Sequence, residues 1–245
     1  MFSNLFKKSD KPSAAVFVDY EHWYYGYNNI FSMKPNVQEW YDELTEEYNV
    51  KKLMFFGDFN GSAIEKELPK LEKITKDGVD KDFTDFIILD AIYREAAKKD
   101  SPDVFVIFTG DAHFNLAIKY LRELKKKVII YGVKRSLSNK LKSSANSYVE
   151  MPRTNQEQHY YYDAILKSLY ILKKRRKMAT YYKTIDNVSA HSGVSRERIQ
   201  AALDDLMSNK YLAEEEKQYR GKKPKVLVVN WDRLEEEGLW SNSNS

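Results

Sequence analysis

The sequence predicts an α/β fold with a doubly wound parallel sheet of about five strands, followed by a smaller α+β module of helices and a hairpin. Short, continuous apolar runs alternate with longer amphipathic stretches. The apolar runs lack polar residues at every second position, as expected for strands that are covered on both faces. A change in composition after Met151 indicates the second module.

The elements of the first part follow from the spacing of its apolar residues. The expected strands are residues 14–18, 52–56, 104–108 and 128–131, with a shorter fifth strand at residues 147–151. Helices are indicated by apolar residues three and four positions apart, at residues 37–48, 62–74, 85–98 and 115–126. Pro69 interrupts the second of these helices. Strands and helices that alternate in this way are typical of a Rossmann-like sheet.

The second part has the order of elements of a winged helix, with three helices and then a hairpin that has a basic tip. The expected helices are residues 160–174, residues 184–190 and a third, capped by Ser195, that runs to Asn209. The expected hairpin strands are residues 211–219 and 225–231. The chain then divides into an N-terminal tail at 1–13, an α/β domain at 14–151, a linker at 152–158, a winged-helix-like domain at 159–234 and a C-terminal tail at 235–245.

Composition excludes several classes of protein. The chain has no cysteine, which excludes disulfides and thiolate metal sites. No apolar run reaches the roughly 18 residues of a membrane span, so no membrane contact is expected. Residues 1–12 are too short and too polar for a signal peptide. We therefore expect a cytoplasmic protein.

The net charge of +4 is carried by the second part of the chain. Residues 151–245 hold 17 of the 40 Lys and Arg residues and 13 of the 36 Asp and Glu residues, which leaves 23 of each sign in residues 1–150. A basic face that binds phosphate backbones is one interpretation. The other is that the run from Lys173 to Lys177 is an ordinary solvated helix end.

Acidic residues follow three of the predicted strands. Asp19 and Asp111 come after the first and third strands, and Asp58 follows the second. In an open parallel sheet the functional crevice lies beyond the carboxyl ends of the strands, so we expect these side chains to face one crevice. Asp85, at the predicted start of a helix, is a fourth candidate.

A cluster of carboxylates needs a compensating charge. Two carboxylates about 4 Å apart repel by roughly 4 kcal/mol at an effective dielectric constant of about 20. With no cysteine and no histidine pair nearby, oxygen ligands favour Mg²⁺ or Mn²⁺ over zinc. A divalent ion can orient water and neutralise a phosphodiester under attack, so the expected chemistry is hydrolysis of nucleic acid.

Each aspartate also has a structural explanation. Asp85 could cap its helix, and Asp58 could close a turn. Asp19 and Asp111 are harder to explain in this way, because each follows a run of buried-type residues where an unpaired charge is costly. Asp90, five residues after Asp85, points away from it on an ideal helix and is a weaker candidate.

With these residues, the first part resembles the NYN domain family, which is related to the PIN-like nucleases. The resemblance covers roughly residues 14–151. Its most specific part is the pair Gly110 and Asp111, followed by a helix and a Lys-Val-Ile strand. The segments that carry it are Val16 to Trp23, Phe83 to Phe86, Thr109 to Phe114 and Lys126 to Gly132.

The resemblance implies a metal-dependent ribonuclease with Mg²⁺ or Mn²⁺. It places the family's first-strand aspartate at Asp19, its helix-opening aspartate at Asp85 and its glycine-linked aspartate at Asp111. Asp58 is expected to assist in binding the metal. His22, His113 and Thr109 are expected to support the site.

Two positions depart from the family pattern. Many members have a second aspartate where this chain has His113, and an asparagine where it has His22. A neutral imidazole can ligate a metal or bond a phosphate, but the loss of a carboxylate lowers the charge that holds the cation. Activity could be low, altered in metal preference or absent, and both histidines could instead serve the fold.

The second part is expected to grip nucleic acid, with RNA as the expected partner. The residues proposed for this contact are Arg196, Arg198 and Gln200 near the exposed start of the third helix, and Lys222, Lys223 and Lys225 on the wing. The alternative is that the module dimerises or packs on the first domain, so a homodimer is possible. The aromatic residues Trp23, Tyr24, Tyr25 and Tyr27 could stack on unpaired bases, although such residues more often belong to a core.

Two other functions stay open at this point. The first is a regulator that binds RNA or DNA and keeps the fold without turnover. The second is a phosphatase for small esters, although Asp19-Tyr20-Glu21 lacks the second aspartate of the aspartyl-phosphate enzymes.

Overall fold

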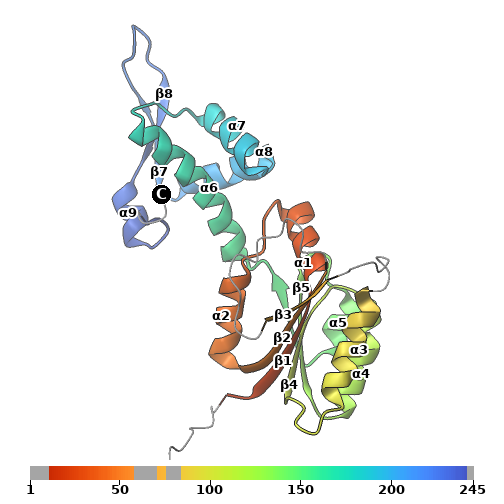
Figure 1. Cartoon of the computed structure of the whole chain (residues 1–245). Coiled ribbons are helices and arrows are strands. Elements are labelled where there is room, and N and C mark those ends of the chain that lie inside the picture. The colour runs from red at the N-terminus through yellow and green to blue at the C-terminus, as the bar shows by residue number, and fades with distance from the viewer. Residues whose placement is uncertain (1–10, 58–70, 76–83, 242–245) are drawn as a thin grey trace, which may run out of the picture. The chain divides into compact units, whose positions relative to one another are not determined.

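The computed structural model describes residues 11–57, 71–75 and 84–241 (Figure 1). Contacts divide the chain into two compact units, one of Met1–Ile30 with Lys34–Pro152 and one of Phe31–Met33 with Arg153–Ser245. Among the described residues, no helix has both the length and the apolar character needed to cross a membrane.

The first unit contains a parallel sheet of six strands in the order β3-β2-β1-β4-β5-β6. The chain builds outward from β1 in one direction and then crosses over to build outward from β4 in the other. This order confirms the predicted doubly wound α/β fold. The strands are β1 (Ser13–Asp19), β2 (Asn49–Gly57), β3 (Leu71–Thr75), β4 (Val104–Phe108), β5 (Lys127–Val133) and β6 (Ser147–Met151).

Helices cover both faces of the sheet, with α1 and α2 on one face and α3, α4 and α5 on the other (Figure 1). The helices are α1 (Tyr20–Gly26), the π-helix η1 (Tyr27–Phe31), α2 (Val37–Glu47), α3 (Thr84–Ala96), the 3₁₀ turn η3 (Ala112–Phe114), α4 (Asn115–Glu123) and α5 (Asn139–Ser144). The predicted helices at 37–48, 85–98 and 115–126 are therefore confirmed to within a few residues.

The core has two layers, one on each face of the sheet, and aromatic rings stack in both. Under α3 and α4, the rings of Phe17 and Phe105 stack with centroids 6.0 Å apart. On the α1 face, Phe108 stacks on Trp23 at 4.3 Å, and Trp40 meets Trp23 edge to face at 5.1 Å. Because side chains alternate across a strand, both faces must be apolar, which explains the continuous apolar runs in the sequence.

The prediction of a helix at residues 62–74 is wrong for its last residues, because β3 begins at Leu71 and pairs with β2. Residues 62–70 lie outside the described part of the chain. The apolar spacing suggested a helix, but the apolar residues of a segment as short as β3 do not distinguish a helix from an edge strand. The hydrogen-bonded pairing with β2 decides the outcome. The sheet therefore has one more strand than expected.

Several short elements were not predicted. The helix α1 begins directly after β1, and η1 continues it. Its aromatic residues are poor helix formers in isolation, so the packing of this helix on the sheet stabilises it more than helix propensity does. The six-residue helix α5 begins after Ser138, whose hydroxyl accepts a hydrogen bond from the Lys140 N–H at 3.2 Å.

The second unit contains helices followed by an antiparallel hairpin. Its elements are α6 (Thr154–Lys174), α7 (Tyr181–Ser192), α8 (Arg196–Ser208), β7 (Leu212–Glu216), β8 (Lys225–Val229) and α9 (Trp231–Glu236). The expected linker at 152–158 is mostly helical, because α6 begins at Thr154 and the Gln156 side chain accepts from the Arg153 N–H at 3.0 Å. Ser195 precedes α8 as expected, but its side chain makes no capping hydrogen bond.

The hairpin ends in a tight turn at the predicted basic tip. Tyr219 and Lys222 exchange backbone hydrogen bonds of 2.9 Å in both directions across Arg220 and Gly221. Both turn residues have positive φ angles, of 45° and 75°, as two-residue hairpin turns require.

The C-terminal boundary differs from the prediction. The hairpin strand expected to reach Trp231 ends at Val229, and Trp231 begins α9 instead. Residues 235 and 236, expected in the tail, finish α9, and Trp240 is buried against Tyr170 and Trp231 with ring centroids 5.3 and 5.2 Å away. Burial of a large aromatic ring stabilises this segment against the unit.

Candidate metal centre

The strand order brings two of the predicted aspartates to one edge of the sheet. The strands β1 and β4 are parallel neighbours, with Val18 opposite Phe108, and the strand order reverses between them. Asp19 is the last residue of β1, and Asp111 follows β4 after Thr109 and Gly110. Ligand sites in open α/β sheets lie at this reversal point, beyond the carboxyl ends of the strands.

Asp19 also begins the helix that follows it. Its Oδ1 atom accepts a hydrogen bond from the His22 N–H at 3.0 Å, which caps α1. The carboxylate is half-buried and lines a cavity of about 400 Å³ together with Asp85. The structural and functional explanations of Asp19 are therefore compatible, since a carboxylate has several acceptor positions.

Asp85, Asp111 and His113 form an Asp/Asp/His cluster. Their ligand atoms all lie within 4.8 Å of one another; the two carboxylates are half-buried and the imidazole is exposed. Asp111 Oδ1 accepts from the His113 N–H at 2.9 Å, and His113 Nδ1 lies 2.9 Å from the same oxygen. Two carboxylates and an imidazole are a donor set that divalent cations accept, so the residues present fit a metal ion.

Thr109, directly after β4, holds the backbone of Asp111 in this cluster. Its side chain is fully buried, and its hydroxyl oxygen accepts a hydrogen bond from the Asp111 N–H at 3.2 Å. This contact fixes the backbone at the position where the chain leaves β4. Thr109 thereby orients Asp111 without reaching the cavity itself.

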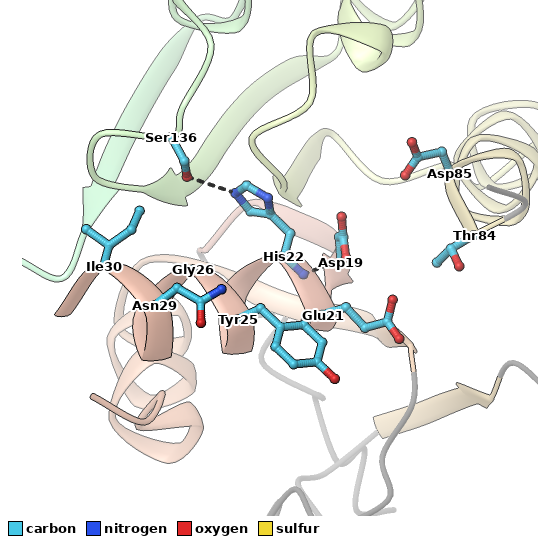
Figure 2. Close-up of a pocket in the computed structure, with 10 residues that line it drawn as sticks. All are labelled: Asp19, Glu21, His22, Tyr25, Gly26, Asn29, Ile30, Thr84, Asp85 and Ser136. Atoms are coloured by element: carbon cyan, nitrogen blue, oxygen red, sulfur yellow. Dashed lines mark hydrogen bonds between the residues drawn. The ribbon is translucent and has the colours of Figure 1, made fainter. Parts of the chain in front are cut away.

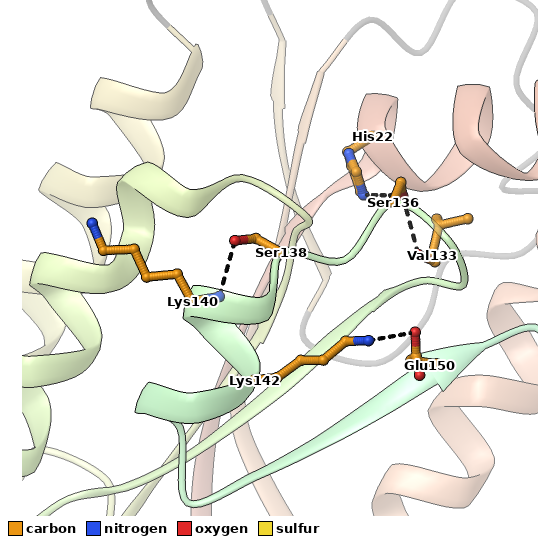
Figure 3. A network of polar contacts seen from close by, with 7 residues as sticks. All are labelled: His22, Val133, Ser136, Ser138, Lys140, Lys142 and Glu150. Carbon is orange, nitrogen blue, oxygen red and sulfur yellow. Dashed lines mark hydrogen bonds and ion pairs between the residues drawn. The ribbon is translucent and has the colours of Figure 1, made fainter.

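His22, in the first turn of α1, contacts the loop after β5. Its Nε2 atom is 3.4 Å from the Ser136 hydroxyl, which donates its hydrogen to the Val133 carbonyl at 3.1 Å (Figure 3). Because the hydroxyl has one hydrogen, this pattern favours the tautomer with hydrogen on Nε2. Burial lowers the pKa of His22, and the negative charge of Asp111 opposes that shift, so the ring is neutral at neutral pH.

Gly110 makes room for the His22 ring. A Cβ atom at this position would lie 2.3 Å from His22 Cε1 and 2.9 Å from the Ser136 carbonyl oxygen. We expect Gly110→Ala to lower the free energy of unfolding by about 1–3 kcal/mol, the usual cost of overpacking, and to lower any activity of the adjacent Asp111. Urea unfolding followed by circular dichroism measures the effect.

The His22→Ala background tests the cause of that loss. If the ring is the obstacle, Gly110→Ala should cost less in this background, with a coupling of about 0.5 kcal/mol or more. Equal costs in both backgrounds would show that the clash is not with His22.

The cavity beside Asp19 and Asp85 is also lined by Glu21, Asn29 and Ser136, which the sequence did not single out (Figure 2). Tyr25, which the sequence offered as a residue that could stack on unpaired bases, lines it as well. Glu21 has a signal in the sequence, because it follows Asp19 by two residues. The Glu21 side chain runs beside Gly57, where a Cβ would lie 2.8 Å from Glu21 Cγ.

Two other acidic candidates do not join the described site. Asp58 lies outside the described residues. Asp90 is exposed and pairs with Arg94 at 2.7 Å one turn along α3, which is an ordinary surface ion pair.

The residues of the second unit that were predicted to bind nucleic acid differ in their surroundings. Arg196 forms an ion pair with Asp186. Arg198, expected at an exposed position, is half-buried, donates to the Ser32 hydroxyl at 3.4 Å and lies over the Phe31 ring at 5.9 Å. Gln200 and Lys225 line a cavity of about 490 Å³, and Lys222 and Lys223 are exposed at the hairpin tip.

The first unit is similar to known proteins. The sequence model of the family described as NYN domain matches residues 13–152. A solved structure of a protein of unknown function from Vibrio parahaemolyticus is similar, with 22% sequence identity, a TM-score of 0.49, and coverage of 60% of this chain and 96% of that chain. A search of the curated proteins found no match. The residues that the family model matches include Asp19, Asp85 and Asp111.

Proposed function

We propose that this chain, which belongs to the NYN domain family, is a divalent-metal-dependent nuclease that cleaves RNA. The observation that carries the proposal is the cluster of Asp85, Asp111 and His113, with ligand atoms within 4.8 Å of one another. Carboxylates this close repel unless a cation or a proton compensates them. Mg²⁺ and Mn²⁺ are the ions that carboxylate oxygens favour, and the imidazole nitrogen makes Mn²⁺ the better fit, because Mg²⁺ is held mainly by oxygen.

The residues around the cluster have separate tasks in this proposal. Asp85, Asp111 and His113 would hold the cation, and Asp19 adds negative charge at the same edge of the sheet. When bound, a divalent cation supplies positive charge against the charge that builds on a phosphodiester, and it makes water more acidic. His22, held neutral by burial, is suited to a hydrogen bond with a phosphate or ribose oxygen.

The Glu21 carboxylate would compensate for the charge of the missing second aspartate. Where many family members have a carboxylate, this chain has His113, whose side chain is 80% exposed. Glu21 of α1 brings a carboxylate into the cavity that Asp19 and Asp85 line. It would add negative charge near the cation from a different element.

The second unit is proposed to be a winged-helix-like module that grips the same RNA strand. Besides the hairpin, the segment between α6 and α7 bonds to β8, since the Leu227 N–H donates to the Ala179 carbonyl at 2.9 Å. A third strand-like segment beside the hairpin is consistent with a winged helix. Lys222, Lys223 and Lys225 would contact phosphates, while the partners of Arg196 and Arg198 suggest that those residues stabilise the module.

Incubation of labelled single-stranded RNA, duplex RNA and DNA with the protein tests the function. We expect wild type to cut RNA with Mn²⁺, and both EDTA and Asp19→Asn to abolish cutting. The asparagine keeps an oxygen for the His22 N–H, so α1 retains its cap while the charge is lost.

Other outcomes identify the competing functions. The exposed His113 in place of an acid favours a regulator that binds nucleic acid without turnover. Binding of all oligonucleotides without cleavage at any Mn²⁺ concentration would support that function. Hydrolysis of a chromogenic phosphate ester with no RNA cleavage would identify a phosphatase.

A further inference from the structure

Tyr25 differs in exposure from most aromatic residues of α1 and η1. Tyr20, Trp23 and Tyr27 are each at most 3% exposed and belong to the core, whereas Tyr25 is 52% exposed. Its ring lines the cavity that contains Asp19 and Asp85. Tyr24 packs against it at an angle of 84°, with centroids 5.6 Å apart, which restricts the ring. Packing of the helix on the sheet does not account for an exposed aromatic ring at this position.

The side chains that line the cavity follow one side of α1 and η1. Asp19, His22, Tyr25 and Asn29 are spaced by three or four residues, so they share a helix face. Figure 2 shows Tyr25 between Asn29 and Glu21 along the helix, with Asp19 and Asp85 toward the end where the helix begins. The cavity therefore has an acidic end and an end with an aromatic ring and an amide.

The geometry points to a nucleobase subsite on α1, in which the Tyr25 ring stacks on an unpaired base and the Asn29 amide bonds to its edge. The inference rests on the proposed function, in which the phosphate next to this base faces the carboxylates. A cavity of about 400 Å³ is within the size range of small-ligand sites and can take one nucleotide.

The chemistry of the two side chains suits this ligand. A tyrosine ring stacks on any base because every base has a π face, and an amide both donates and accepts hydrogen bonds. Asn29 is exposed, and its Oδ1 accepts a long 3.4 Å hydrogen bond from the Asn28 amide. A base held in a duplex is already stacked on both faces, so the subsite favours single-stranded RNA.

A binding measurement without cleavage tests the subsite. The probe is a single-stranded oligoribonucleotide with one 2-aminopurine, bound in EDTA by full-length Asp111→Asn protein, which lacks one of the charges that repel phosphate. We expect stacking to quench the 2-aminopurine. Tyr25→Ala should weaken binding by roughly 5- to 100-fold, and Tyr25→Phe should bind within about twofold of the parent.

Two controls make the result specific. Tyr148→Ala removes a tyrosine of similar exposure, 46%, from β6 of the same unit, and should leave binding unchanged. A fully abasic oligonucleotide of the same length should bind the parent and Tyr25→Ala equally, because no base remains to stack. Circular dichroism confirms that each variant is folded.

The outcomes separate this inference from the proposed function. Equal binding of Tyr25→Ala and the parent, or an equal loss in Tyr148→Ala, would overturn the subsite even if wild type cuts RNA. Quenching that depends on Tyr25, in a protein that never cuts RNA, would support the subsite and reject only the nuclease.

Discussion

Replacing Asp111 with asparagine is expected to lower the rate of RNA cleavage by about 10²- to 10⁴-fold. The positive charge of a divalent cation stabilises the negative charge that builds on a reacting phosphodiester, which lowers the barrier by several kcal/mol. Each 1.36 kcal/mol is roughly a factor of ten in rate. Asparagine keeps an oxygen that can accept from the His113 N–H, so η3 should form as before. What is lost is one of the two carboxylates of the cluster. Initial rates on a fluorescent single-stranded RNA, measured against Mn²⁺ concentration, give the effect.

Asp90→Asn is the matched control for this substitution. Asp90 is an exposed aspartate of the same unit that forms a surface ion pair with Arg94. Loss of such a pair changes stability by about 1 kcal/mol at most and should leave cleavage within twofold of wild type. Cleavage by Asp111→Asn at the wild-type rate would mean that the cluster does not carry the reaction.

The sheet was largely predictable, because each buried strand is recorded in the sequence as a continuous apolar run. The runs at Ala14 to Val18 and Val104 to Phe108 are examples, and β1 and β4 lie where those runs predicted them. The edge strand β3 was not predictable in the same way. One neighbour supplies its pairing, so its sequence needs less apolar character and matches a helical spacing as well.

The carboxylates were predictable only as far as topology places them. The rule that sites lie beyond strand ends located Asp19 and Asp111, because the strand ends carry both residues. Asp85 comes from a helix that crosses to that edge, and its closeness to Asp111 depends on packing that no local pattern records. Asp58 lies outside the described residues and stays a prediction.

The side chains that complete the cavity could not be found from strand ends. Tyr25 was a candidate for stacking on bases, but Tyr25 and Asn29 lie in α1 and η1, which were not expected, so a common face could not be assigned to them from the sequence. Ser136 reaches His22 because the chain turns back after β5, which is a tertiary event. Arg198 shows the converse, since a basic residue that suggested a nucleic-acid contact is engaged by Phe31 and Ser32 of its own unit.

Trp23→Ala is expected to lower the free energy of unfolding of the first unit by about 3–5 kcal/mol, a large share of the total stability of a domain. The Trp23 side chain is fully buried and stacks on Phe108 of β4 at 4.3 Å. It also meets Trp40 of α2 at 5.1 Å, so its loss opens a cavity between two helices and the sheet. Urea unfolding followed by circular dichroism measures the change, and a loss under 1 kcal/mol would contradict this account of the core.

Tyr25→Ala is the control that separates stability from binding. It lies two residues away on the same helix but is half-exposed, so its loss should change the free energy of unfolding by about 0.5 kcal/mol or less. If both assignments hold, Trp23→Ala weakens the fold and with it every activity, whereas Tyr25→Ala weakens RNA binding in a protein of normal stability. A large loss of stability in Tyr25→Ala would instead make the ring part of the core and remove the reason to give it a ligand.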